Sequence, residues 1–357
     1  MEFIDTLKQV LARAHFFVMP FTICVSLILL FDRVAPKLGI VDKPSVRKLH
    51  KGNVPLIGGL AMFFAFAMVS IMLTQHQSQL VLLVLALALV LLGSLDDVFD
   101  LNAYFRMIIQ AVVALLMVHA AGLQINTVGD LTGFGPSAFS PAIATVFTVV
   151  CTLGVINSVN MIDGMDGLAG TILFISFSAL GGIAAFHGDG LTAKVLLILV
   201  GAIVAFLCFN SRVFVDSARI FMGDSGSMFM GFTLCWFLIK LTQGESPAMS
   251  AVAAGWIFGL PLADTISVMV KRLKERRSPF DAGRDHIHHM LLDSGFSVNQ
   301  TLFIMGSVHL VLVLIGFSLV LNSALEPLYF WAFVALVVGH HFLTPRLLTA
   351  TRGVTDP

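Results

Sequence analysis

Acidic side chains gather in the segment Asp96-Asp97-Val98-Phe99-Asp100, which follows a long apolar stretch. If that stretch is helical to its end, Asp96 and Asp100 share one face and Asp97 points about 100° away. Carboxylates this close raise one another's pKa values unless a cation compensates their charge. The segment therefore predicts a divalent metal site or a general base. A solvated helix end is the alternative, and it is unfavourable because carboxylates there oppose the helix dipole.

A second polar segment, residues 157–167, has the sequence NSVNMIDGMDG. A helix end that runs into a turn would point its regularly spaced amides and carboxylates into one region. The glycines permit close backbone approach to a ligand, backbone N–H groups can bind phosphate, and carboxylates can hold Mg²⁺. Two ordinary Asp-Gly turns are the alternative interpretation. The side chains concerned are Asn157, Asn160, Asp163 and Asp166.

Two further motifs contain groups that suit metal and phosphate chemistry. In residues 221–227, FMGDSGS, small residues beside Asp224 leave room for a metal ion and a phosphate, although Asp224 could equally cap a helix. Residues 284–289, RDHIHH, bring together imidazoles that could bind zinc. No cysteine lies near them, and the carboxylate-rich segments favour a hard ion such as Mg²⁺ or Mn²⁺. The histidines then suit hydrogen bonds to phosphate oxygens.

Basic residues concentrate in residues 43–51, KPSVRKLHK, and in residues 271–277, KRLKERR. The first run either sets the membrane topology or receives an anionic substrate or lipid headgroup. We interpret the second run as a membrane anchor. The scattered histidines, His309 and His340 among them, are interpreted as packing or interfacial residues.

These motifs must be positioned by a chain that is 57% hydrophobic and 12% charged, with a mean hydropathy of +0.94. Soluble domains carry roughly 25% charged residues, so an ordinary cytosolic enzyme is excluded, and the apolar content excludes a disordered protein. Four widely separated cysteines exclude a disulfide scaffold and a zinc ribbon. The net charge of zero gives no reason to expect nucleic-acid binding.

Continuous apolar stretches of nearly the length that a bilayer requires run through the whole sequence. They predict an all-α, polytopic membrane bundle of about eleven transmembrane helices, which forms a single integral membrane domain over residues 1–357. The predicted spans are residues 16–31, 54–73, 79–95, 104–121, 141–156, 168–186, 191–209, 228–241, 250–270, 301–321 and 327–343.

The basic residues set the predicted orientation of this bundle. Of the 21 Lys and Arg residues, 17 follow odd-numbered spans or lie in the C-terminal segment, so this side is predicted to be cytoplasmic. The N-terminus is then outside and the C-terminus cytoplasmic. Carboxylates contribute little to orientation, yet 15 of 21 fall on the same side, which indicates a polar site there. The loops expected to form it are residues 32–53, 96–103, 157–167, 210–227 and 271–300.

Acidic metal ligands, basic groups and histidines on one face of an apolar bundle favour phosphoryl chemistry on a lipid. A hard cation bridges phosphate oxygens, and basic side chains stabilise the transition state. The bilayer admits a polyprenyl tail, while the cytosol supplies a nucleotide.

The two acidic segments, the motif around Asp224 and the histidine motif follow one another in this order and lie on one predicted side of the membrane. In both respects they resemble the motifs of the polyprenyl-phosphate N-acetylhexosamine-1-phosphate transferases of glycosyltransferase family 4. The resemblance extends from Val41 to about Gly295. The histidine motif has Ile287 at its second position and follows Arg284-Asp285, which is similar to the bacterial WecA-type branch. The branch that builds the peptidoglycan lipid precursor usually has consecutive histidines there.

This resemblance implies UDP-GlcNAc and undecaprenyl phosphate as substrates, and undecaprenyl-pyrophosphoryl-GlcNAc and UMP as products. Such enzymes start O-antigen and enterobacterial common antigen synthesis at the cytoplasmic face of the bacterial inner membrane. UDP-MurNAc-pentapeptide or another UDP-amino sugar is the alternative within the family. A secondary transporter is the alternative outside it, although transporters place their polar groups near the bilayer midplane. Exposed aliphatic helices permit a homodimer.

The resemblance also implies roles for individual residues. Asp224 is expected to bind Mg²⁺, with Asp163 close to the metal and the pyrophosphate. Asp96 and Asp97 are expected to handle the lipid phosphate, and one of them could act as its base. Independently of the resemblance, we favour direct attack by this phosphate, with an aspartyl-phosphate intermediate as the alternative. The remaining predicted contacts with substrate are Asn157, Asn160, Asp166, Asn210 and Phe221 in the binding pocket, and Lys51, His286, His288 and His289 at phosphates.

Overall fold

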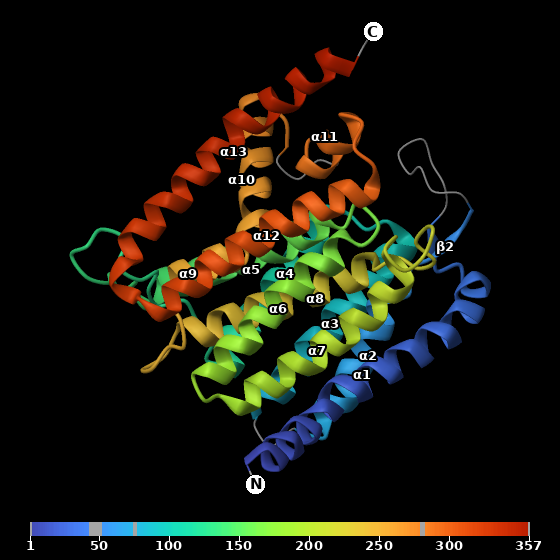
Figure 1. Cartoon of the computed structure of the whole chain (residues 1–357), viewed down its shortest axis with the longest axis horizontal. Helices are drawn as coiled ribbons and strands as arrows, with labels where there is room; N and C mark the ends of the chain where they lie inside the picture. Colours follow the sequence, from blue (N-terminus) through green and yellow to red (C-terminus); the bar gives the residue numbers. More distant parts are fainter. Residues whose placement is uncertain (1, 43–51, 74–76, 279–282, 356–357) are drawn as a thin grey trace.

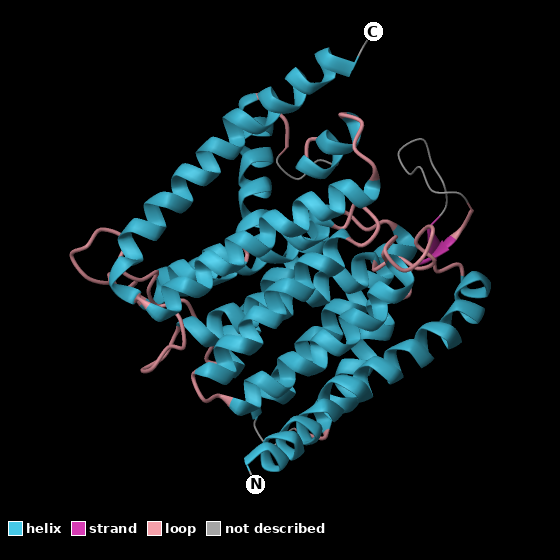
Figure 2. Ribbon diagram, in the orientation of Figure 1, coloured by secondary structure: helices cyan, strands magenta, loops and turns pink. Residues whose placement is uncertain are grey.

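The computed structural model describes residues 2–42, 52–73, 77–278 and 283–355, so Lys51 and the basic run 43–51 lie outside the described residues. Helices make up about three quarters of the described chain, and loops form most of the rest (Figures 1 and 2). They are α1 (Glu2–Leu38), α2 (Gly58–Ile71), α3 (Gln77–Phe99), α4 (Ala103–Ala121), α5 (Pro141–Ile162), α6 (Leu168–Phe186), α7 (Gly190–Asn210), α8 (Gly223–Thr242), α9 (Ala251–Ile257), α10 (Gly259–Lys274), α11 (Ile287–Asp293), α12 (Val298–Leu321) and α13 (Glu326–Thr355). The short strands β1 (Val41–Asp42) and β2 (Val54–Pro55) pair antiparallel.

The predicted all-α polytopic membrane architecture is confirmed. Within the described ranges, nine helices are long and apolar enough to span a bilayer, or ten if the bent pair α9–α10 counts as one span. The predicted span 54–73 forms only the 14-residue helix α2, because β2 occupies its start. The total of eleven spans and the sides of the two termini stay predictions.

The predicted span 250–270 is not one continuous helix, because α9 and α10 meet at a bend of 82° at Phe258. Pro261 lies four residues after Ile257 and has no N–H group to donate to the Ile257 carbonyl, so the helical ladder is interrupted there. In Figure 1, α10 leaves the bundle and runs toward α11 and α13.

Helix α8 occupies the centre of the bundle, and nearly all of its residues are buried. Glycines bring its first turn unusually close to its neighbours. A Cβ atom on Gly59 of α2 would lie 2.2 Å from the Cα atom of Gly226, and one on Gly93 of α3 would lie 2.3 Å from the backbone nitrogen of Ser225. Small residues permit this kind of close helix packing within membranes. The start of α8 is therefore held against the end of α3, where the first acidic motif lies.

Candidate active site

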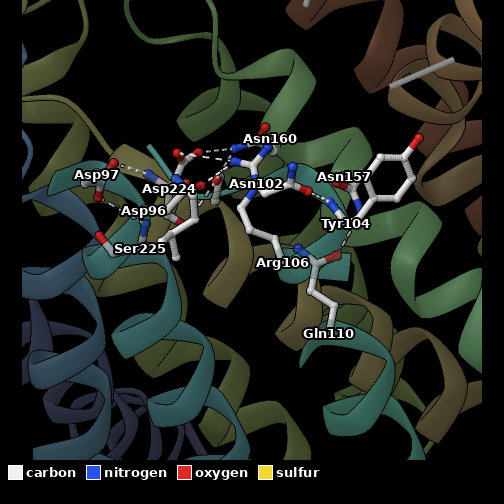
Figure 3. Close-up of polar contacts among 12 residues, drawn as sticks. Asp96, Asp97, Asn102, Tyr104, Arg106, Gln110, Asn157, Asn160, Asp224 and Ser225 are labelled. Carbon is white, nitrogen blue, oxygen red and sulfur yellow. Dashed lines mark hydrogen bonds and ion pairs between the residues drawn. The ribbon is translucent and has the colours of Figure 1, made fainter. Parts of the chain in front are cut away.

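Asp224 is the second residue of α8, and the carboxylate of Asp97 from α3 lies beside it (Figure 3). Asp97 accepts hydrogen bonds from the backbone N–H groups of Asp224, at 2.8 Å, and of Ser225, at 3.3 Å. A carboxylate suits this position because the first N–H groups of a helix lack partners within it. Gly223 has a positive φ of 73°, and a Cβ there would lie 2.7 Å from a carboxylate oxygen of Asp97. The turn therefore requires glycine.

Asn160 and Asp163 reach the same place from the end of α5. The Nδ2 atom of Asn160 donates to the carboxylate of Asp224 and to the hydroxyl of Ser227, the latter at 2.9 Å. Burial is the main cause that raises the pKa of Asp163 well above its ordinary value. The negative charges of neighbouring carboxylates, first that of Asp224, raise it further. The site thus holds more negative charge than its own cations balance, which favours the binding of a cation.

Asp96 points into the protein and is paired with Arg106 of α4. Its side chain is 1% exposed, and it also accepts a hydrogen bond from the backbone N–H of Leu101 at 2.8 Å. The same Arg106 nitrogen lies 3.7 Å from a carboxylate oxygen of Asp224, so this guanidinium joins two acidic motifs. Asp100 lies beyond the end of α3 with a φ of 50°, so the predicted shared helix face of Asp96 and Asp100 is wrong.

The loop that follows Asp163 is braced by Asn210, the last residue of α7. The side-chain oxygen of Asn210 accepts from the backbone N–H of Gly167 at 2.8 Å, and its nitrogen donates to the carbonyl of Ile220 at 2.9 Å. Asp166 accepts from the Nε of Arg212 at 2.7 Å. Because both ends of the Asn210 amide are engaged by backbone, contact with substrate through this residue stays a prediction.

The histidine motif is anchored by Asp264 of α10. One oxygen of Asp264 lies 2.7 Å from the Nδ1 of His286, and the other accepts from the backbone N–H of Ile287 at 3.0 Å. His288 is fully buried, and a Cβ on Gly164 would lie 2.6 Å from its Nε2. Burial, followed by the nearby His289, lowers the pKa of His288 to about 3, so this ring is neutral at physiological pH. The motif therefore lies directly against the loop of Asp163.

A polar cavity of about 650 Å³ opens between these elements, and we call it the polar cavity. The residues of the sequence motifs that line it come from α3, α8, α11, the ends of α5 and α7, and the loops that follow these two helices. They are Asp97, Asn160, Asp163, Asp166, Asn210, Phe221, Asp224 and His289. Arg212, Arg284 and Asp293 also contribute to its wall.

Two further cavities adjoin the polar cavity in succession. A basic pocket of about 230 Å³ is lined by Arg106, Arg272, Asn157, Asn160, His286 and His289, among others. An apolar groove of about 650 Å³ runs between α5, α8, α9 and α10 and is lined mainly by aliphatic side chains. The polar cavity and the basic pocket share Asn160 and His289. The basic pocket and the apolar groove share Met107, Asn157 and Met161, so the three spaces are adjacent in this order.

Three residues of the site are not predicted by the sequence motifs. Arg272 is 1% exposed and lines the basic pocket, so the membrane-anchor interpretation of its basic run is wrong for this residue. Arg106 is the single Asp, Glu, Lys or Arg residue of α4, and Asp264 lies in the apolar first half of α10, before its basic last turn. A charge within an apolar stretch is usually functional. That signal is present in the sequence, but it does not reveal which motif each residue contacts.

The predicted site residues fall into three groups. Eight line the polar cavity, as given above, while Asn157 and His286 line the basic pocket. Asp96 and His288 lie behind the cavity walls, paired with Arg106 and packed on Gly164, respectively. Lys51 lies outside the described residues.

The donor set suits Mg²⁺ bound together with a phosphate. Among the residues that the structure describes, no three His, Cys, Asp or Glu side chains surround one metal position. Mg²⁺ usually binds through one or two carboxylates together with waters and substrate phosphates rather than in a complete protein cage. Asp163 and Asp224 provide two carboxylates in one cavity, and the raised pKa of Asp163 indicates that its charge lacks compensation.

Comparison with known proteins supplies an independent finding. The family model described as "Glycosyl transferase family 4" matches residues 79–242. A protein of Escherichia coli O157:H7 named "Undecaprenyl-phosphate alpha-N-acetylglucosaminyl 1-phosphate transferase" is 36% identical over 82% of this chain and 80% of its own length. Proteins of the same name from Salmonella typhi and Haemophilus influenzae are each 34% identical, over 81% and 78% of this chain and 79% of their own lengths.

Proposed function

The chain belongs to glycosyl transferase family 4, and on this premise we propose that it transfers GlcNAc-1-phosphate from UDP-GlcNAc to undecaprenyl phosphate. The products are undecaprenyl-pyrophosphoryl-GlcNAc and UMP. The observation that carries the proposal is the continuous order of polar cavity, basic pocket and apolar groove around one cluster of carboxylates. A soluble sugar nucleotide and a lipid acceptor need this combination of environments at a shared centre.

The polar cavity suits the nucleotide sugar. Phe221 offers a ring on which a uracil can stack, and Arg284 and His289 offer donors for the pyrophosphate. The cavity's volume of about 650 Å³ lies within the usual range for sites that enclose small molecules.

The basic pocket suits the phosphate of the lipid acceptor. Arg106 and Arg272 supply guanidinium groups, which recognise phosphate oxygens through paired hydrogen bonds. The isoprenoid chain then continues into the apolar groove past Met107 and Met161, which line both spaces. This arrangement leaves the phosphate next to Asn160, at the boundary with the polar cavity.

The proposed reaction is a direct, in-line displacement. An oxygen of the lipid phosphate attacks the β-phosphorus of UDP-GlcNAc, a new P–O bond forms, and the bond from that phosphorus to the bridging oxygen breaks as UMP leaves. A phosphate monoester is largely ionised at neutral pH, so the attack does not depend on a base. Asp97 holds the start of α8 by its backbone N–H groups, which positions the carboxylate of Asp224 for the cation.

Asp163 and Asp224 are the proposed ligands of Mg²⁺, or of Mn²⁺. Bound there, the ion would neutralise charge on the pyrophosphate oxygens as the leaving group departs. The basic side chains of the pocket stabilise the remaining charge of the transition state. Arg106 lies between the basic pocket and the proposed metal ligands, since its guanidinium pairs with Asp96 and approaches Asp224.

We further propose that the site faces the cytoplasm from the bacterial inner membrane and serves the first membrane step of O-antigen or enterobacterial common antigen synthesis. The support is the bias of Lys and Arg residues toward the loops that carry the site. Exposed aliphatic faces along the membrane helices, including those of α3 and α4, are compatible with a homodimer.

The test is UMP release by the purified protein, with undecaprenyl phosphate and each of UDP-GlcNAc, UDP-MurNAc-pentapeptide and a second UDP-amino sugar. We expect release with UDP-GlcNAc, its loss with EDTA and its return with added Mg²⁺. Release with UDP-MurNAc-pentapeptide alone would transfer the proposal to peptidoglycan synthesis. Absence of UMP together with sugar uptake into proteoliposomes would support a transporter instead.

A further inference from the structure

A polar pair lies inside the apolar bundle at the break between α9 and α10. The hydroxyl of Ser176, on α6, donates to the carbonyl of Ile257 at 3.0 Å, and the same oxygen lies 2.9 Å from the Nε2 of His309, on α12. Ser176 and His309 are both 0% exposed. Neither belongs to a sequence motif of the site, and neither lines any of the three cavities described above.

The carbonyl that Ser176 contacts is the one that Pro261 leaves without its helical partner. In a regular helix the carbonyl of Ile257 would accept from the backbone N–H of residue 261, and proline has none. A carbonyl without a partner is costly in a membrane interior, and a serine from a neighbouring helix can satisfy it. Ser176 therefore substitutes for the hydrogen bond that the break removes.

The position of the protons follows from the same contacts. A serine hydroxyl carries one proton, and Ser176 gives it to the Ile257 carbonyl, which can only accept. His309 must then carry a proton on Nε2 and donate it to the Ser176 oxygen. The result is a two-step chain of hydrogen bonds that links α12, α6 and the end of α9.

The break sets the direction of α10, and α10 carries Asp264. Asp264 lies six residues beyond Phe258, which is about 9 Å along a helix axis. A change of roughly 5° in the bend would therefore move Asp264 by about 0.8 Å. Because Asp264 contacts both His286 and the backbone of Ile287, such a shift would be passed to the histidine motif.

We propose that Ser176 and His309 are positioning residues, which hold the bend of α9–α10 at the angle that places the histidine motif against the loop of Asp163. This inference rests on the proposed function, since its effect is read through phosphoryl transfer. A displacement of about 1 Å can lower a rate roughly 100-fold, and it affects the transition state more than substrate binding. The expected loss is thus mainly in kcat.

The experiment compares Ser176→Ala with Ser178→Ala in the purified full-length protein. Ser178 lies on the same helix but is exposed, so its substitution is the matched control. We expect Ser176→Ala to lower kcat about tenfold while the KM for UDP-GlcNAc changes less than about twofold. His309→Leu should give a similar loss, whereas His309→Gln, which keeps a donor, should retain most of the rate.

A second readout tests whether Ser176 compensates for the helical hydrogen bond that the Ile257 carbonyl lacks. Pro261→Ala returns a backbone N–H at position 261, which can bond the Ile257 carbonyl in place of Ser176. Ser176→Ala should therefore lower the unfolding temperature of the parent protein, but lower that of the Pro261→Ala protein much less. Equal losses in the two backgrounds would contradict the role assigned to the carbonyl.

Each outcome separates this inference from the proposed function. If the parent protein and Ser178→Ala release no UMP, the proposed function fails. If they release UMP and Ser176→Ala matches them in kcat, the positioning role is wrong while the function stands. If Ser176→Ala does not fold, the comparison of His309→Leu with His309→Gln decides, and equal rates for these two variants would overturn the inference.

Discussion

The loop 122–140 lies at the end of the bundle opposite the site. There the carboxylate of Asp130 accepts hydrogen bonds from the backbone N–H groups of Thr132 at 3.1 Å, Gly133 at 2.7 Å and Gly135 at 3.0 Å. Burial opposes the shift, but the hydrogen bonds overcome it and lower the pKa of Asp130. At the site end, by contrast, burial and neighbouring carboxylates raise the pKa of Asp163. The carboxylate of Asp130 is thus stabilised by local backbone, whereas that of Asp163 is destabilised by burial and by neighbouring negative charges.

The contrast indicates how to recognise the working end of this bundle. Asp189, also opposite the site, caps α7 by accepting from the backbone N–H of Thr192 at 3.0 Å and from its hydroxyl at 2.6 Å. Carboxylates satisfied in this way stabilise loops and helix ends. A buried carboxylate whose charge is opposed by its neighbours, such as that of Asp163, is suited to binding a ligand, and perturbed pKa values accordingly concentrate at functional sites.

The largest expected effect comes from Asp224→Asn. The change removes one negative charge from the cluster and one proposed metal ligand while keeping the shape of the side chain. We expect UMP release to fall about 10³-fold, with little change in unfolding temperature. Asp130→Asn is the control at the opposite end and should leave the rate unchanged. Similar rates of UMP release in the two variants would contradict the assignment of the Asp224 end of the bundle as the catalytic end.

Arg106→Lys should have the next largest effect. Lysine keeps the positive charge beside Asp96 but loses the planar pair of donors that recognises phosphate. We expect kcat/KM for undecaprenyl phosphate to fall about 30-fold, chiefly through KM. Lys194→Gln removes a cation near the opposite end of α7 and should have no such effect. A normal KM for the lipid in Arg106→Lys would argue against the basic pocket as the phosphate site.

Gly164→Ala tests the contact between the Asp163 loop and the histidine motif. The new Cβ would lie 2.6 Å from the Nε2 of His288, so the buried ring must shift. We expect kcat to fall roughly tenfold. Gly182→Ala is the matched control, because a Cβ there meets no atom within 4 Å and alanine favours the helix. An unchanged rate in Gly164→Ala would show that the position of His288 is unimportant.

The smallest effect is expected from Asp189→Ala, and it should appear in stability alone. Loss of the helix cap should lower the free energy of unfolding by about 1 kcal/mol. Thermal unfolding in detergent measures this loss, and kcat per folded protein should stay at the parent value. A drop in kcat would mean that the opposite end is coupled to the site.

Much of the site could be predicted from the sequence, because its groups stand in short runs. Asp97, Asn160, Asp163 and Asp224 come from three such runs, and the structure places them around one cavity. Spacing alone predicts that local groups converge. It does not predict the role of a side chain such as Asn210, whose amide bonds two backbone segments that meet only in the fold.

The membrane class, most of the helical spans and the acidic and histidine motifs were determined by the sequence itself, since hydropathy and short spacings are local properties. Tertiary structure alone decided that Arg106 and Arg272 line one pocket and that Asp264 holds His286. Pro261 interrupts the predicted span 250–270 locally, but only the tertiary structure gives the angle of 82° at that break. These features depend on contacts between side chains far apart in the chain, and no local pattern encodes which distant partner a buried charge or an orphaned carbonyl will meet.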